Sequence, residues 1–161
     1  MTDLPASEVI IQRLKVTLEA SSRVQDKKVL ELKLDSFHRC VKRIEEKNLE
    51  VGDRLSSDFD LQDIVSFNLE RAVQQCVDIA AHILADYDQP RGQAAASLFE
   101  DLALMGHISK ELSQKLAKAA GFRNLLVHRY ASIDWNRVAA VIPYELIIFR
   151  QFSEAITARC L

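Results

Sequence analysis

The sequence predicts an all-α fold, an up-and-down bundle of four to six helices. The chain has 161 residues but only 4 glycines and 3 prolines, too few for a fold that needs many tight turns. Its apolar residues recur at intervals of three and four, the period of a helix that is buried on one face. The connections between these runs are short, so we expect neighbouring helices to be antiparallel. A hydrophobic fraction of 48% with 27% charged residues fits one soluble domain with its own core.

Residues 1–27 are interpreted as an N-terminal extension, and residues 28–161 as the bundle domain. Within the extension, Leu14, Val16 and Leu18 alternate with polar residues, as in a strand, although the apolar residues also suit one side of a helix. We favour a helix because no neighbouring segment offers a partner strand.

The next two helices are expected at residues 28–48 and from residue 58 to about Tyr87, with a loop over residues 49–57 between them. Either Asp58 or Asp60 can cap the second of these helices. The first has a single apolar stripe, formed by Leu30, Leu34, Phe37, Val41 and Ile44.

Three further helices are expected in the rest of the chain. The first covers residues 94–105 and is stopped by Gly106. The next begins after a Ser109 cap and reaches about His128, and the last begins at an Asp134 cap and reaches about Arg159. Pro143 lies inside the last helix and is expected to kink it.

A row of polar residues also follows the helical period along the helix that begins at residue 58. Such a row is commonly a solvated face, but its short side chains also suit the wall of a polar cleft or a subunit interface. The residues of this candidate cleft wall are Asn68, Arg71, Gln75, Asp78 and His82.

Composition and motifs exclude several classes of protein. Cys40, Cys76 and Cys160 are far apart, which indicates reduced thiols in the cytoplasm and neither a zinc site nor a disulfide framework. No apolar run is long enough to span a bilayer, and no signal peptide is evident. There is no glycine-rich phosphate loop, and the 4 histidines lack a metal-ligand spacing. We therefore expect no cofactor, no metal and no membrane association.

The charge of the chain is unevenly distributed. The net charge is −2, which argues against a protein that coats nucleic acid by charge alone. Residues 109–161 nevertheless carry eight Lys or Arg and four Asp or Glu. This asymmetry is compatible with chance, and it also suits a surface that binds phosphates.

The remaining candidate for chemistry is a short polar segment at the end of the helix that follows Ser109. Helical spacing puts Asn124 and His128 on one face, and the long side chain of Arg123 can reach the same pocket. A guanidinium can hold a phosphate, and a cationic imidazole, which suits the C-terminal end of a helix, can donate a proton. These groups suffice for metal-free cleavage of RNA by its own 2′-hydroxyl. The same residue types also serve commonly as caps and surface pairs.

A complete acid–base pair needs a second histidine, and one helix offers only one. Two subunits that meet at a two-fold axis would supply the pair, so we expect a homodimer with both His128 rings in one cleft.

The segment from Arg123 to Tyr130, with Asn124 after the arginine, resembles the R-x4-H-x-Y motif of the HEPN superfamily. More narrowly, it resembles the HepT toxins of the MntA–HepT system. The resemblance extends to DFDLQDIVSFNLERAVQQCVDIAAHI at residues 58–83 and to CVKRIEE at residues 40–46.

A further match lies at Ile133, Asp134 and Trp135, so the resemblance covers about residues 28–160. It implies a dimeric helical bundle and a toxin of a type VII toxin–antitoxin system. The implied activity is a metal-independent endoribonuclease.

Carried over by position, the resemblance implies that Arg123, Asn124 and His128 are catalytic. The implied partner is an MntA-like nucleotidyltransferase antitoxin, which transfers AMP to Tyr130 and assembles with the toxin. A bulky anion two residues from His128 would block the cleft and repel RNA. Two alternatives remain open: a non-catalytic, substrate-binding subunit of a minimal nucleotidyltransferase, and an unrelated helical interaction domain.

Overall fold

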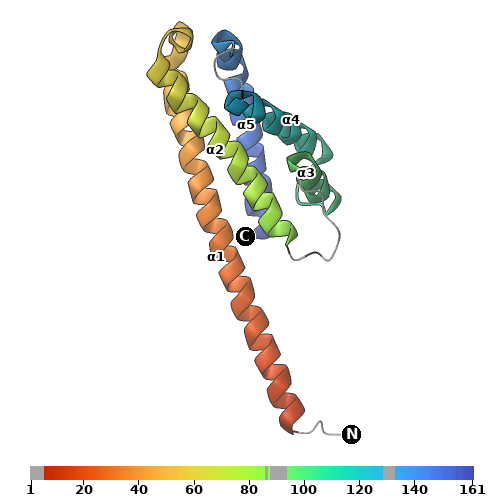
Figure 1. The fold of residues 1–161 in the computed structure, drawn as a ribbon. Coiled ribbons are helices and arrows are strands. Elements are labelled where there is room, and N and C mark those ends of the chain that lie inside the picture. The colour runs from red at the N-terminus through yellow and green to blue at the C-terminus, as the bar shows by residue number, and fades with distance from the viewer. Residues whose placement is uncertain (1–5, 86, 88–93, 129–132) are drawn as a thin grey trace.

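The computed structural model describes residues 6–85, 87, 94–128 and 133–161, and it confirms the all-α prediction (Figure 1). Long helices lie side by side in the described part, and the shorter α3 packs against α4. No described helix combines the length and the apolarity needed to cross a membrane. The elements are α1 (Ala6–Val51), the 3-10 helix η1 (Gly52–Ser56), α2 (Phe59–Leu84), α3 (Ala95–Leu104), α4 (Lys110–His128) and α5 (Trp135–Cys160).

The later helices begin or end at cap residues that the sequence predicts. Asp58, not Asp60, caps α2, because its carboxylate accepts a hydrogen bond from the backbone N–H of Leu61 at 3.0 Å. Ser109 Oγ accepts from the N–H of Leu112 at 3.1 Å at the start of α4. Gly106 follows α3 with a φ of +79°, a left-handed conformation that glycine adopts without strain. The last helix continues through Pro143 without ending there.

The prediction of a loop over residues 49–57 was wrong. Helix α1 continues to Val51, and η1 follows it directly. The reason is packing: Leu55 in η1 is fully buried, and its carbonyl accepts a hydrogen bond from Nε2 of Gln62 at 2.8 Å. These contacts hold η1 against α2, so the turn between α1 and α2 forms part of the core.

Three phenylalanines join α1 to α5 at the centre of the core. Phe37 of α1 packs edge to face on Phe149 and Phe152 of α5, with ring centroids 5.7 and 6.0 Å apart. All three side chains are almost completely buried. Aromatic pairs with this geometry stabilise a core beyond the area they bury, so they hold α5 in one orientation.

The first part of α1 lies outside the bundle. We call residues 6–25 the overhang, because Figure 1 shows this end of α1 extending well beyond the other helices. Its described side chains, from Glu8 to Gln25, are all exposed. The contacts with the other helices begin at Asp26 and Lys27, and Nζ of Lys27 donates to the carbonyl of Leu161 at 3.0 Å. Within the described residues the extension is therefore a helix, continuous with the first helix of the bundle.

The cap of α5 leads to a test of the fold. Oδ1 of Asp134 accepts hydrogen bonds from the N–H groups of Asn136 and Arg137 at 3.1 and 3.2 Å. We expect Asp134→Ala to lower the free energy of unfolding by about 1 kcal/mol, because two helix N–H groups lose their acceptor. Urea denaturation followed by circular dichroism measures the change. Asp134→Asn is the matched control and keeps most of the stability, since asparagine is also a good cap. Equal losses in the two variants would contradict this role.

Candidate functional site

The end of α4 carries the three side chains that the sequence singled out. Asn124 and His128 are both exposed, and their spacing of four residues places them on one face of the helix. Among the described residues, neither side chain has a hydrogen-bond or ion-pair partner. Within the described part of the chain, they therefore take no part in the caps and surface pairs that such residues often form.

Arg123 occupies a different position from its two neighbours. The buried face of α4 passes through Leu116, Ala119 and Ala120, and Arg123 continues it one turn later. Its side chain is half-buried, and its Nε is fully buried without an acceptor in the described part of the chain. An arginine has five N–H donors in a planar fork. The guanidinium of Arg123 therefore has unused donors among the described residues, on a face of α4 about 140° around the helix from that of His128.

Tyr130, the expected AMP acceptor, lies outside the described residues. The last described residue of α4 is His128, two residues before it. Its role therefore stays a prediction.

The polar row on α2 is largely satisfied by local contacts. Nδ2 of Asn68 donates to the carbonyl of Ile64 at 2.7 Å, and Oδ1 of Asp78 accepts from Nε2 of Gln74 at 2.8 Å. The guanidinium of Arg71 lies over the ring of Phe67, 5.4 Å from its centroid. These contacts do not show a cleft, and the role of the row as a cleft wall stays a prediction.

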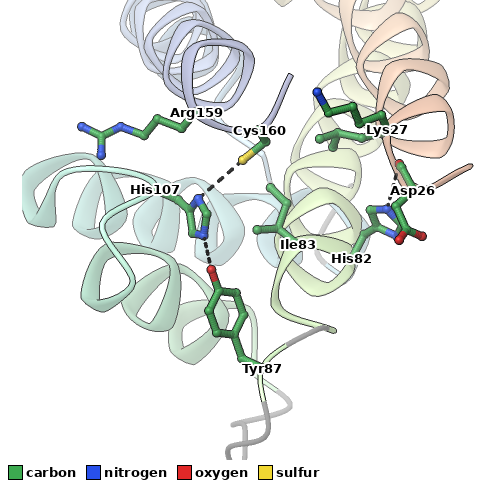
Figure 2. Close-up of a pocket in the computed structure, with 9 residues that line it drawn as sticks. Asp26, Lys27, His82, Ile83, Tyr87, His107, Arg159 and Cys160 are labelled. Atoms are coloured by element: carbon green, nitrogen blue, oxygen red, sulfur yellow. Dashed lines mark hydrogen bonds between the residues drawn. The ribbon is translucent and has the colours of Figure 1, made fainter. Parts of the chain in front are cut away.

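His82, the last member of the row, lies in a pocket at the other end of the bundle (Figure 2). This pocket of about 210 Å³ is lined by α1, by α2 and the turn after it, by the turn before α4, and by α5. His107, at that turn, is separated from His128 by the whole length of α4, about 27 Å at 1.5 Å per residue. Within one protomer, the structure therefore does not bring His82 to the end of α4.

The pocket contains a chain of polar contacts that the sequence did not predict. Nε2 of His107 lies 3.0 Å from the hydroxyl of Tyr87, and its Nδ1 lies 3.4 Å from Sγ of Cys160 (Figure 2). Burial, with the positive charge of Arg159, lowers the pKa of His107. Burial raises the pKa of Cys160. A neutral imidazole beside a protonated thiol is a structural pair, with no activated nucleophile.

Glu145 is a buried carboxyl that sequence reasoning missed. It lies on the core face of α5 and is 7% exposed, and its Oε2 has no hydrogen-bond partner in the described part. Burial raises its pKa to about 7. Burial also raises the pKa of Cys76 on α2 far above its usual value, and the charge of Glu145 adds to that shift. The core positions of α5, Val138, Ile142, Phe149 and Phe152, have the spacing that would have indicated a buried residue at 145.

Several large apolar side chains are exposed near the end of α4 and on α5. Leu125 and Val127 lie between Asn124 and His128 in sequence, and both are about half exposed. Tyr144 and Ile147 are exposed on α5. Exposed apolar groups of this kind suit a protein–protein contact. The described residues contain no group of three or more His, Cys, Asp or Glu arranged to hold a metal ion.

A helical bundle that presents an arginine, an asparagine and a histidine in R-N-x3-H spacing at one helix end defines a HEPN-type domain. The model of the ribonuclease HepT-like family matches residues 37–156. The chain therefore belongs to the ribonuclease HepT-like family.

Three similar proteins illustrate the family. The mRNA nuclease HepT of Shewanella oneidensis is 36% identical over 126 residues, which cover 78% of this chain and 94% of that protein. The tRNA nuclease HepT of Aphanizomenon flos-aquae is 30% identical, over 73% of this chain and 80% of that protein. A solved structure of the tri-AMPylated Shewanella oneidensis HEPN toxin in complex with the MNT antitoxin has a TM-score of 0.74. It is 34% identical and covers 81% of this chain and 98% of that chain.

The buried carboxyl leads to a test by pH. The folded protein holds the proton of Glu145 more tightly than the unfolded chain, whose carboxyl has the ordinary pKa of 4.5. Stability is therefore lost as the pH rises from about 4.5 through about 7. We expect Glu145→Gln to abolish this loss, because an amide does not ionise. Between pH 5 and pH 8, the wild type should lose about 2.5 kcal/mol more free energy of unfolding than the variant.

Urea denaturation at the two pH values measures this difference. Glu154→Gln, at an exposed position of the same helix, is the matched control and should follow the wild type. Parallel pH dependence in wild type and Glu145→Gln would show that this carboxyl ionises freely in the folded protein.

Proposed function

We propose that this chain is the toxin of a type VII toxin–antitoxin pair, an endoribonuclease that needs no metal and acts as a homodimer. The observation that supports the proposal is the end of α4, where Arg123, Asn124 and His128 fall within six residues and have no partners among the described residues. Family membership adds support, since two relatives bear the names of an mRNA nuclease and a tRNA nuclease. A related toxin has been solved in complex with its MNT antitoxin.

The three side chains suit cleavage by the 2′-hydroxyl of the RNA. That hydroxyl loses its proton to a base and forms a bond to the neighbouring phosphorus, and the bond from phosphorus to the 5′-oxygen breaks. The products are a 2′,3′-cyclic phosphate and a 5′-hydroxyl. Arg123 binds the phosphate oxygens as negative charge develops on them, and Asn124 can donate its amide N–H to the same phosphate. A protonated His128 delivers a proton to the leaving oxygen.

A dimer completes this chemistry. The reaction needs a base and an acid at the same time, and each protomer offers one histidine at this site. Two α4 ends that meet at a two-fold axis place one His128 on each side of the phosphate. The exposed Leu125 and Val127 beside the site provide apolar surface for that contact.

Regulation is proposed to act on Tyr130, two residues after His128. An MntA-like nucleotidyltransferase antitoxin would transfer AMP to its hydroxyl with release of pyrophosphate from ATP. The adduct places a phosphate and a base beside the cleft, where they block RNA and repel its phosphates. The tri-AMPylated state of the related Shewanella oneidensis toxin supports modification of this kind.

Removal of the proposed acid–base group tests the nuclease. We expect purified wild-type protein to degrade RNA in the presence of EDTA, and His128→Ala to reduce the rate at least about 100-fold, as is typical for loss of a general acid–base group. Denaturing gels of a labelled RNA measure the rate. His38→Ala, which removes an exposed histidine on α1, is the matched control and should cleave at the wild-type rate.

Each outcome of that experiment assigns a function. Intact RNA after incubation with unmodified wild-type protein would reject the nuclease and favour a non-catalytic, substrate-binding subunit of a nucleotidyltransferase. Cleavage that needs a divalent cation would reject metal independence alone.

Mass spectrometry tests the regulation of Tyr130. We expect the intact protein to gain the mass of one or more AMP groups when the antitoxin and ATP are supplied, and to lose RNA cleavage in parallel. Tyr130→Phe should stay unmodified and active, because the acceptor hydroxyl is gone. Tyr144→Phe removes another exposed hydroxyl and is the matched control. Modification of the Tyr130→Phe variant would place the acceptor elsewhere.

A further inference from the structure

One side of α4 faces solvent along its whole length. Six residues of the helix fall within an arc of about 80° when each residue advances the helix by 100°. All six are exposed, so this arc is the outer face of the helix. The outer face consists of Lys110, Gln114, Lys118, Gly121, Leu125 and His128. The proposed acid–base group, His128, therefore lies at one end of a continuous exposed face.

Gly121 on this face is not explained by packing within the protomer. It lies inside α4, seven residues before His128, where a glycine destabilises a helix relative to alanine. Its φ is not positive. A Cβ at this position would meet no neighbouring side chain or helix of the described part of the chain within 4 Å. Gly121 therefore leaves a space that only a molecule outside the protomer can use, as where a ligand approaches a backbone closely.

The charge around Gly121 suits a polyanion. Lys118 lies one turn before Gly121 on the outer face, and it has no ion-pair partner in the described part of the chain. Lys115, on the flank of the helix, is by contrast paired with Glu111 at 2.6 Å. Between Lys118 and His128 the sequence contains no Asp or Glu. This part of α4 therefore presents positive charge that attracts phosphates.

The outer face changes in character toward the start of α4. There Glu100 of α3 lines a groove together with Lys110 and Gln114, so an acid and a base share the groove. The segment that suits a polyanion therefore runs only from Lys118 to His128, which is about 15 Å at 1.5 Å per residue.

A second copy of α4 suits this segment less well than RNA does. If two α4 helices crossed antiparallel at Gly121, each His128 would lie about 10 Å from the crossing and the two would be about 20 Å apart along the helices. The proposed cleavage needs both His128 rings at one phosphate. If the helices crossed parallel, the two-fold axis would place Lys118 opposite Lys118 of the other copy, where like charges repel.

We propose that a single strand of RNA lies along the outer face of α4, with its sugar–phosphate backbone against Gly121 and a phosphate bound by Lys118. The inference rests on the proposed nuclease, because the strand extends from the phosphate at His128. At the 3.4 Å spacing of a stacked strand, the segment corresponds to about four nucleotides. One row of contacts follows one backbone, so the substrate is RNA with a single-stranded segment of this length beside the cleaved bond.

Binding of an RNA octanucleotide tests this inference without relying on cleavage. His128→Ala serves as the parent protein, so that the RNA stays intact, and fluorescence anisotropy measures Kd. We expect Gly121→Ala in this parent to weaken binding at least about fivefold, because the added methyl group occupies the space of the RNA backbone. The same substitution should raise the midpoint of urea unfolding, since alanine is the better helix former. Weaker binding by a more stable protein excludes damage to the fold.

Lys118→Gln in the same parent tests the phosphate contact. We expect it to weaken binding and to reduce the slope of log Kd against log salt concentration by about 0.7, the contribution of one phosphate contact on a single strand. Lys115→Gln removes the same charge from the flank of the helix and is the matched control. It should bind like the parent, because Glu111 already neutralises Lys115.

Cleavage separates this inference from the proposed nuclease. In proteins that keep His128, Gly121→Ala should lose more kcat/KM on the octanucleotide than on a dinucleotide, which is too short to reach Gly121. Absence of cleavage by the wild type would reject the nuclease, and the binding measurements would still decide the inference.

Three results would overturn the inference. One is an octanucleotide that does not bind, or that binds the parent, Gly121→Ala and Lys118→Gln equally. Another is an equal loss of affinity in Lys118→Gln and Lys115→Gln, which would show a general effect of charge. The third is a lower sedimentation mass of Gly121→Ala with unchanged RNA affinity, which would assign the outer face to a second copy of the chain.

Discussion

The orientation of α5 against α1 depends on the contact between Phe37 and the pair Phe149 and Phe152. These rings are almost fully buried, and their edge-to-face geometry permits little rotation of one helix on the other. The start of α5 follows the end of α4 after a short connection, and Asp134 caps it. The position of the α4 end, and with it the site at His128, therefore depends on a core contact between helices far apart in the sequence.

The bundle tolerates two unsatisfied polar atoms in its described interior, Nε of Arg123 and Oε2 of Glu145. A buried polar atom without a partner destabilises a fold, and functional sites are where proteins commonly retain such groups. For Arg123 the proposed function supplies a reason, since a guanidinium without an internal ion pair is free to bind a phosphate. Glu145 has no comparable explanation in the contacts around it, beyond its proximity to the thiol of Cys76.

The two ends of the molecule differ in chemistry. At one end, Asn124 and His128 are exposed and free of partners among the described residues. At the other end, the polar side chains have partners. His107 contacts the hydroxyl of Tyr87, and His82 contacts the backbone carbonyl of Asp26 on α1. The overhang leaves the bundle at that second end (Figure 1).

The sequence by itself determined which segments are helices and where most of them begin. The stripe from Leu30 to Ile44 and the caps at Asp58, Ser109 and Asp134 act between residues a few positions apart, and such contacts can be read along the chain. Short spacing along the chain also allowed the sequence to single out Arg123, Asn124 and His128 as candidates, since all three lie on one helix. Only the tertiary structure placed Leu55 and Glu145 in the core and separated His82 from His128. Which residues are buried or line a pocket depends on which helices pack together. Contacts between residues distant in sequence determine that packing.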